Sequence, residues 1–122
     1  MRGGLLKGVA ALMVLAELIE GPKCGYEINS TISKRLGAAL PPGYVYVILR
    51  HLEKEGFVVS EASAYKARRK RTYRITEKGL QFLIQHEDKV DRLMSILSYV
   101  KSVMELAKAK ASALHSYRKD LS

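Results

Sequence analysis

Residues 41–75 read PPGYVYVILRHLEKEGFVVSEASAYKARRKRTYRI and decide the fold. From Gly43 to Glu55 the apolar residues recur at the three- and four-residue spacing of a helix. That spacing predicts a buried stripe made of Val45, Ile48, Leu49 and Leu52. Gly56 ends the helix, and two short runs typical of β-strands follow at residues 57–61 and 71–75. The polar residues between them predict a hairpin with a loop over residues 62–70.

Two further helices precede this segment. The stretch from Leu5 to Ile19 is apolar over most of its helical circumference, so we expect this helix to be covered on two sides. Gly21 and Pro22 end it. A second helix runs from Gly25 to Leu36 and ends at Gly37, because its isoleucines recur at four-residue spacing. The order helix, helix, helix, strand, basic loop, strand is that of a winged helix-turn-helix.

The tip of the predicted hairpin, residues 66–71, which we call the wing, is strongly basic. The chain has a formal charge of +9, and residues 1–76 carry 13 Lys and Arg against 6 Asp and Glu. Five of these positive charges belong to Lys66, Arg68, Arg69, Lys70 and Arg71. A charge run alone is often only a solvated surface. Beside a helix-turn-helix it predicts contacts with DNA phosphates, and such binding weakens steeply with salt.

The helix from Gly43 to Glu55 is expected to present its outer face to the major groove. Arg50 is suited to a base or phosphate contact, and Val47 can meet a thymine methyl group. Tyr44 and Val47 are predicted to point away from the core, with Tyr46 and Arg50 on the flank. Both tyrosines can donate hydroxyl hydrogen bonds to phosphate, and the alternative is that one or both belong to the core.

The rest of the chain predicts one long helix, with Thr76 as its N-cap and its end near Tyr117. At 1.5 Å per residue such a helix is roughly 60 Å long, too long to be covered by the rest of the chain. Its apolar residues follow an unbroken heptad pattern: Val90, Leu93, Leu97, Val100, Met104, Ala107, Ala111 and Leu114. This seam predicts pairing across a homodimer that also uses Leu5 and Val9. The alternative is packing on the first helix of the same chain.

The predicted fold is therefore mainly α with a small β-hairpin (α+β). A winged helix-turn-helix DNA-binding domain occupies residues 1–76, and a C-terminal dimerisation helix occupies residues 77–122. Cys24 is the sole cysteine, which excludes an internal disulfide and suits a reducing compartment. The first apolar run is far shorter than the ~20 residues that span a bilayer, so we expect a cytoplasmic protein without a membrane partner.

Catalytic patterns are absent from the sequence. It has no glycine-rich phosphate loop, and its three histidines are far apart. We therefore expect no enzyme activity, no cofactor and no metal. One alternative is a metal site formed by His86, Glu87 and Asp91 on one helix, since these residue types ligate transition metals.

Four segments resemble the PadR family of transcriptional regulators, and the resemblance covers about residues 5–83. They are Glu20-Gly21-Pro22, Cys24-Gly25-Tyr26-Glu27, Pro42-Gly43-x-Val45-Tyr46-x-x-Leu49-Arg50-x-Leu52-Glu53-x-Glu55-Gly56 and Arg69-Lys70-Arg71-x-Tyr73-Arg74-Ile75-Thr76-Glu77-x-Gly79. The resemblance implies a homodimeric repressor whose C-terminal helix pairs with the first and C-terminal helices of its partner. It also implies DNA contacts from Tyr26, from Pro42 and Gly43 at the start of the third helix, and from the wing.

Two positions depart from the family pattern. Tyr44 stands where a small hydroxyl residue is usual, so the contact made there is not carried over, and Cys24 replaces a common histidine. Some relatives bind flat aromatic ligands between tryptophans of the dimer. This chain has no tryptophan, so the sequence identifies no effector.

The sequence thus predicts a sequence-specific regulator, a homodimer on a palindromic operator in double-stranded DNA. The two half-sites would lie about one helical turn apart, roughly 34–36 Å. Three alternatives stay open on the residues alone. One is non-specific or architectural binding of DNA or RNA, the second is a protein-interaction module without nucleic acid, and the third is binding to a membrane surface.

Overall fold

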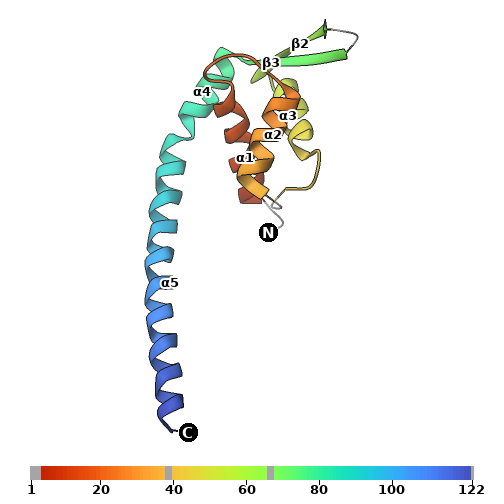
Figure 1. Cartoon of the computed structure of the whole chain (residues 1–122). Coiled ribbons are helices and arrows are strands. Elements are labelled where there is room, and N and C mark those ends of the chain that lie inside the picture. The colour runs from red at the N-terminus through yellow and green to blue at the C-terminus, as the bar shows by residue number, and fades with distance from the viewer. Residues whose placement is uncertain (1–3, 38–39, 66–67, 122) are drawn as a thin grey trace. The chain divides into compact units, whose positions relative to one another are not determined.

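The computed structural model describes residues 4–37, 40–65 and 68–121 (Figure 1). They form two compact units, residues 1–85 and residues 86–122, which we describe separately. The first unit contains α1 (Gly4–Glu17), β1 (Lys23–Cys24), α2 (Gly25–Leu36), α3 (Tyr44–Lys54), β2 (Val58–Tyr65), β3 (Arg68–Ile75) and α4 (Glu77–Gln85). The second contains α5 (Glu87–Leu121). The predicted class, mainly helical with a small antiparallel sheet, is confirmed.

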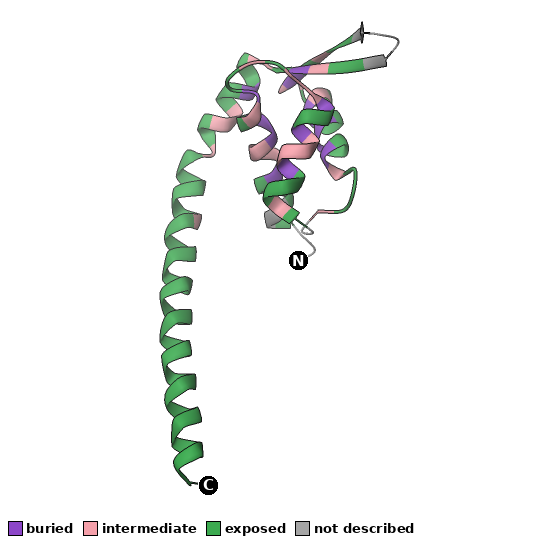
Figure 2. Cartoon of the chain, viewed as in Figure 1, coloured by how far each residue is buried: buried purple, intermediate pink, exposed green. Residues whose placement is uncertain are grey.

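One hydrophobic core holds the first unit together (Figure 2). Helix α1 contributes Val14 and Leu15, the turn that follows it contributes Leu18, and α2 contributes Ile28 and Ile32, all of which are 0–1% exposed. The predicted stripe of α3 is confirmed, because each of its four residues is buried. Three helices with facing apolar stripes therefore fix the direction in which the opposite face of α3 points.

The sheet has three antiparallel strands in the order β1-β3-β2. Its pairing runs from Val58 opposite Ile75 to Tyr65 opposite Arg68. The prediction of a loop over residues 62–70 is therefore wrong. Backbone N–H and C=O groups gain partners when the ladder continues, and charged side chains do not interrupt a ribbon that faces water. The two-residue strand β1, opposite Tyr73 and Thr72, was not predicted.

Helix α4 begins at a tight junction with the hairpin. The hydroxyl of Thr76 accepts the N–H of Gly79 at 3.0 Å and donates to the carbonyl oxygen of Gly56 at 2.7 Å, which confirms Thr76 as the N-cap. A Cβ on Gly79 would overlap the carbonyl oxygen of Phe57. The rings of Phe57 and Phe82 lie 4.3 Å apart between their centres and attach α4 to the core.

The prediction of one continuous helix from residue 77 is wrong, because it is interrupted at His86. Helix α4 carries Phe82 and Leu83 against the core and ends two residues later. The carbonyl of His86 then accepts the N–H of Val90, and α5 begins with Glu87 and Asp88 in its first turn. Acidic residues there favour a new helix N-terminus. None of the described helices is both long and apolar enough to cross a membrane.

Candidate nucleic-acid interface

Helix α3 presents exposed side chains on the face opposite its buried stripe. Val47 is 44% exposed, and Arg50, His51 and Lys54 are also exposed, as the spacing predicts. Gly43 precedes the helix with a left-handed φ of 76°, a conformation that glycine adopts without steric cost. Pro42 and Gly43 are exposed as well. The helix thus offers a cationic and partly apolar surface to a partner.

The two tyrosines at the start of α3 differ in their surroundings. Tyr44 is half-buried and packs against the core, with Lys7 Nζ 5.4 Å from its ring centre. The prediction that Tyr44 points away from the core is therefore wrong. An aromatic ring gains more from apolar packing and a cation–π contact than from exposure. Tyr46 is 38% exposed and stays at the surface.

Gly25 lets the start of α2 approach α3 and β3 closely. A Cβ at this position would lie 3.1 Å from the ring of Tyr46 and 3.3 Å from that of Tyr73. Contacts this short would force at least one ring to move. The glycine therefore brings the N-terminus of α2 beside the exposed face of α3, and Tyr26, 74% exposed, lies in the first turn of α2.

The N-terminus of α2 is closed by Cys24 and Glu27. The thiol and the backbone N–H of Cys24 both donate to Glu27 Oε1, at 3.1 Å and 3.4 Å. These hydrogen bonds, that of the thiol first, lower the pKa of the Glu27 carboxyl. The carboxylate therefore satisfies a free N–H at the helix start and fixes the turn that carries Tyr26.

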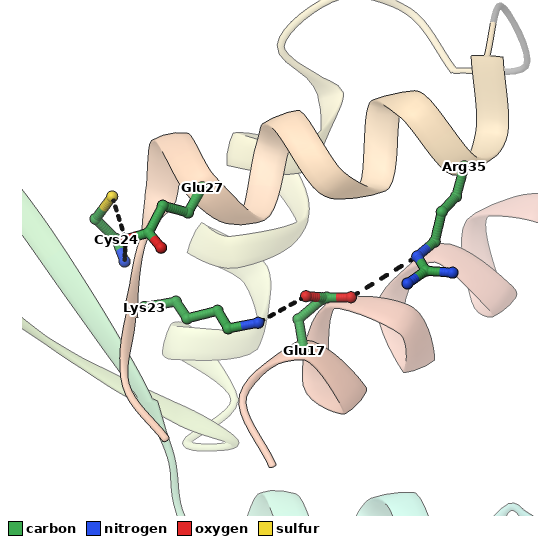
Figure 3. A network of polar contacts seen from close by, with 5 residues as sticks. All are labelled: Glu17, Lys23, Cys24, Glu27 and Arg35. Atoms are coloured by element: carbon green, nitrogen blue, oxygen red, sulfur yellow. Dashed lines mark hydrogen bonds and ion pairs between the residues drawn. The ribbon is translucent and has the colours of Figure 1, made fainter. Parts of the chain in front are cut away.

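Glu17 ties α1 to both ends of the neighbouring segment (Figure 3). Its carboxylate lies 2.9 Å from Lys23 Nζ and 3.9 Å from Arg35 Nε. The hydrogen bond to Glu17 raises the pKa of the Lys23 ammonium group. Lys23 belongs to β1, and Arg35 lies in the last turn of α2. The contacts thus link α1 to β1, just before α2, and to the last turn of α2.

The strand register divides the hairpin between two faces. Tyr73 is buried and Ile75 is half-buried against the core, and Arg71 is the next residue of the same alternation. Lys70 and Arg74 belong to the opposite alternation. Lys66 lies outside the described residues, and so do the side chains of Arg68 and Arg69. The wing therefore carries described basic residues on both of its faces.

A groove separates α3 from β3. It is lined by Tyr46, Arg50, Glu53, Arg71 and Tyr73. Burial, and secondarily the Glu53 carboxylate, raises the pKa of the Tyr73 hydroxyl, which therefore stays neutral. The groove presents two guanidinium groups and two phenolic hydroxyls beside the single carboxylate of Glu53, and the two guanidinium groups are suited to bind a phosphate anion. The spacing of the sequence did not single out Glu53 as part of the site.

Helix α5, taken by itself, leaves its apolar seam uncovered. Leu93 is half-buried, and the other seven seam residues are exposed, with Val90 at 37%, Leu97 at 57% and Leu114 at 63%. Away from the seam, Glu105 pairs with Lys101 at 3.1 Å and with Lys108 at 3.3 Å. Val9 on α1 is 37% exposed, and the side chain of Leu5 lies outside the described residues. Among the described residues, no group of three His, Cys, Asp or Glu could hold a metal ion.

A helix-turn-helix with an exposed third helix and a basic hairpin defines the winged-helix class of DNA-binding folds. The model of the PadR-like family of transcriptional regulators matches residues 14–85, more than half of the chain. The chain therefore belongs to the PadR-like family of transcriptional regulators. The comparison with curated proteins gives no match.

Solved structures share this fold. A transcriptional regulator from Thermoplasma acidophilum is 32% identical, with a TM-score of 0.73, over 80% of this chain and 95% of that chain. A PadR family regulator from Eggerthella lenta is 26% identical, with a TM-score of 0.66, over 79% and 84%. Bacillus subtilis PadR, solved in complex with operator DNA, is 28% identical, with a TM-score of 0.56, over 63% and 46%.

Proposed function

We propose that this regulator is a homodimeric repressor that binds a palindromic operator in double-stranded DNA. The observation that carries the proposal is the exposed face of α3 lying beside a basic hairpin. The structural neighbour from Bacillus subtilis, described as bound to operator DNA, supports the same use of the fold here. In the proposed complex, α3 enters the major groove and the wing lies on the adjacent backbone.

The proposed roles of the described residues on α2 and α3 follow from where their side chains lie, and those of the basic wing residues follow from the sequence. Val47 and Arg50 on the exposed face of α3 meet base edges or the nearest phosphates. The hydroxyl groups of Tyr26 and Tyr46 donate hydrogen bonds to phosphate oxygens. Pro42 and Gly43 are exposed, so the backbone at the start of α3 can approach DNA. The wing supplies Lys66, Arg68, Arg69, Lys70 and Arg71 for the phosphate backbone. Tyr44 acts indirectly, through its packing under Lys7.

The proposed dimer covers the seam of α5. Seven exposed apolar or small residues on one helical stripe are costly in water, and burying apolar surface gives about 25 cal/mol per Å². A second copy presents the same stripe, so a two-fold axis satisfies both seams at once. A two-fold dimer carries two copies of α3, which predicts an operator with inverted half-sites.

Selection from a pool of random duplexes tests the proposed specificity. We expect one inverted-repeat sequence to be enriched, and we expect it to compete against bulk DNA by at least about 1,000-fold at fixed salt. Equal affinity for bulk DNA would instead make the protein a non-specific binder. Absence of any duplex binding would favour the protein-interaction module. A promoter that carries the selected site should give less transcript in vitro when the protein is added.

A further inference from the structure

Three side chains form a hydrogen-bonded chain across the groove between α3 and the hairpin. Arg71 Nη1 donates to Ser60 Oγ at 2.8 Å, and Ser60 Oγ donates to the carboxylate of Glu53. Glu53 belongs to α3, Ser60 to β2 and Arg71 to β3. Glu53 and Ser60 are half-buried, whereas Arg71 is exposed. The chain therefore runs outward from the junction of α3 and the hairpin to the surface.

The chemistry of the three groups fixes the direction of this chain. A carboxylate only accepts hydrogen bonds and a guanidinium only donates them, so the single hydroxyl proton of Ser60 goes to Glu53. A lone pair of Ser60 Oγ then faces Arg71. Hydrogen bonds arranged head to tail in this way polarise and strengthen one another. One of the five N–H groups of Arg71 is engaged by Ser60, and the outward side of the fork can meet an anion.

We infer that Glu53 is a positioning residue for DNA binding. Acting through Ser60, it holds the guanidinium of Arg71 in the groove that Arg50 and Tyr46 also line, where a backbone phosphate of the duplex binds. The inference rests on the proposed function, since DNA is the polyanion. The expected effect of removing Glu53 is therefore opposite to that of its charge. Removal of a carboxylate near DNA relieves repulsion and should tighten binding, but here the loss of Arg71 positioning outweighs that gain, so binding weakens.

Glu61 supplies a matched control for the charge of Glu53. It is exposed, lies opposite Thr72 in β3 and belongs to the opposite alternation from Ser60. Glu53→Ala and Glu61→Ala remove the same charge at neighbouring places. Using a labelled duplex of mixed sequence of about 30 base pairs, we expect Glu53→Ala to weaken binding about fivefold, as for the loss of one typical hydrogen bond. We expect Glu61→Ala to bind as tightly as the unaltered protein or slightly tighter.

Ser60 allows a test without any change of charge. Ser60→Ala should weaken binding about fivefold and reduce the slope of log K against log salt by about 0.9, the loss of one phosphate contact. Ser60→Thr keeps the hydroxyl and should restore both quantities. When Arg71→Ala is already present, Ser60→Ala should have no further effect, because the two residues act as one unit.

The outcomes separate this inference from the proposed function. If the unaltered protein binds no duplex, both are overturned. If it binds and Glu53→Ala tightens binding as Glu61→Ala does, only the positioning role is overturned. The same holds if Ser60→Ala leaves affinity and salt slope unchanged. Thermal unfolding of each variant shows whether it is folded. If Glu53→Ala does not fold, the affinity and salt slope of Ser60→Ala still test the positioning role.

Discussion

Helices α3 and α5 carry the same kind of apolar stripe but differ in what covers it. The stripe of α3 is buried by α1, α2 and the hairpin within the first unit, and Leu49 is 0% exposed. The seam of α5 has no buried residue, and Leu97 is 57% exposed. Three- and four-residue spacing therefore predicts that a face is apolar without saying what covers it. The cover of α3 is in the chain, and we propose that the cover of α5 is a second copy.

The largest expected effect is on dimerisation, which we assign to the seam of α5. Leu97→Asp together with Val100→Asp places unpaired charges in the proposed dimer seam. Each such burial costs about 3 kcal/mol or more, so the dissociation constant of the dimer should rise by more than about 100-fold. Sedimentation velocity measures the change. Ala109→Asp, outside the seam on the same helix, is the control and should leave the dimer intact. Double variants that still sediment as dimers would remove the seam assignment.

The next-largest effect is on DNA binding, which we assign to the first unit. Arg68→Ala with Arg69→Ala should weaken binding to all duplexes, and the slope of log K against log salt should fall by about 1.8, the value for two phosphate contacts. The dimer should persist, because the seam is unaltered. Fluorescence anisotropy at several salt concentrations gives the slope. An unchanged slope would contradict phosphate contacts by the wing.

A smaller effect concerns stability and distinguishes the buried face of α3 from its exposed face. Val45 is 1% exposed and Val47 is 44% exposed. Val45→Ala should lower the free energy of unfolding by about 2 kcal/mol, because it loses burial and leaves a cavity. Val47→Ala should change it by less than about 0.5 kcal/mol. Urea denaturation distinguishes the two variants, and equal losses would mean that the two faces of α3 are wrongly assigned.

The smallest effect concerns the pH dependence of the α2 cap. Folding lowers the pKa of Glu27 below its ordinary value of 4.5, so the carboxylate stabilises the folded state above that pH. This contribution is lost as the pH falls through the lowered pKa. The group is exposed, so we expect less than about 0.5 kcal/mol. Glu27→Gln should remove this part of the pH dependence between pH 5 and pH 3 in urea titrations. An identical pH profile for both proteins would argue against the cap.

Much of the first unit could be predicted from the sequence because its signals are local. The bounds of α2 are those predicted, and Thr76 caps α4 as its position indicates. The four buried residues of α3 follow directly from helical spacing. The resemblance to the family rested on four short segments in the right order and spacing, and two of them contain Gly25 and Gly79, where an added Cβ would lie 3.1 Å from the ring of Tyr46 and would overlap the carbonyl oxygen of Phe57.

Features that depend on distant residues could not be predicted. Strand β1 has two residues and no periodicity, and its pairing with β3 exists only in the folded unit. Tyr44 turned toward the core because Lys7 and the apolar side of α1 lie there. The link from Glu53 to Arg71 needs the strand register, and the sequence placed the strand ends several residues away. The division of roles between residues 1–76 and 77–122 stays a prediction, with the compact unit running to Gln85.

Native mass spectrometry of the protein with its selected duplex tests the central claim most directly. We expect two chains of 13.6 kDa on one duplex, with no complex that contains a single chain. The seam variant Leu97→Asp with Val100→Asp should bind the same duplex weakly and one chain at a time. A single unaltered chain bound tightly to the selected duplex would contradict the account.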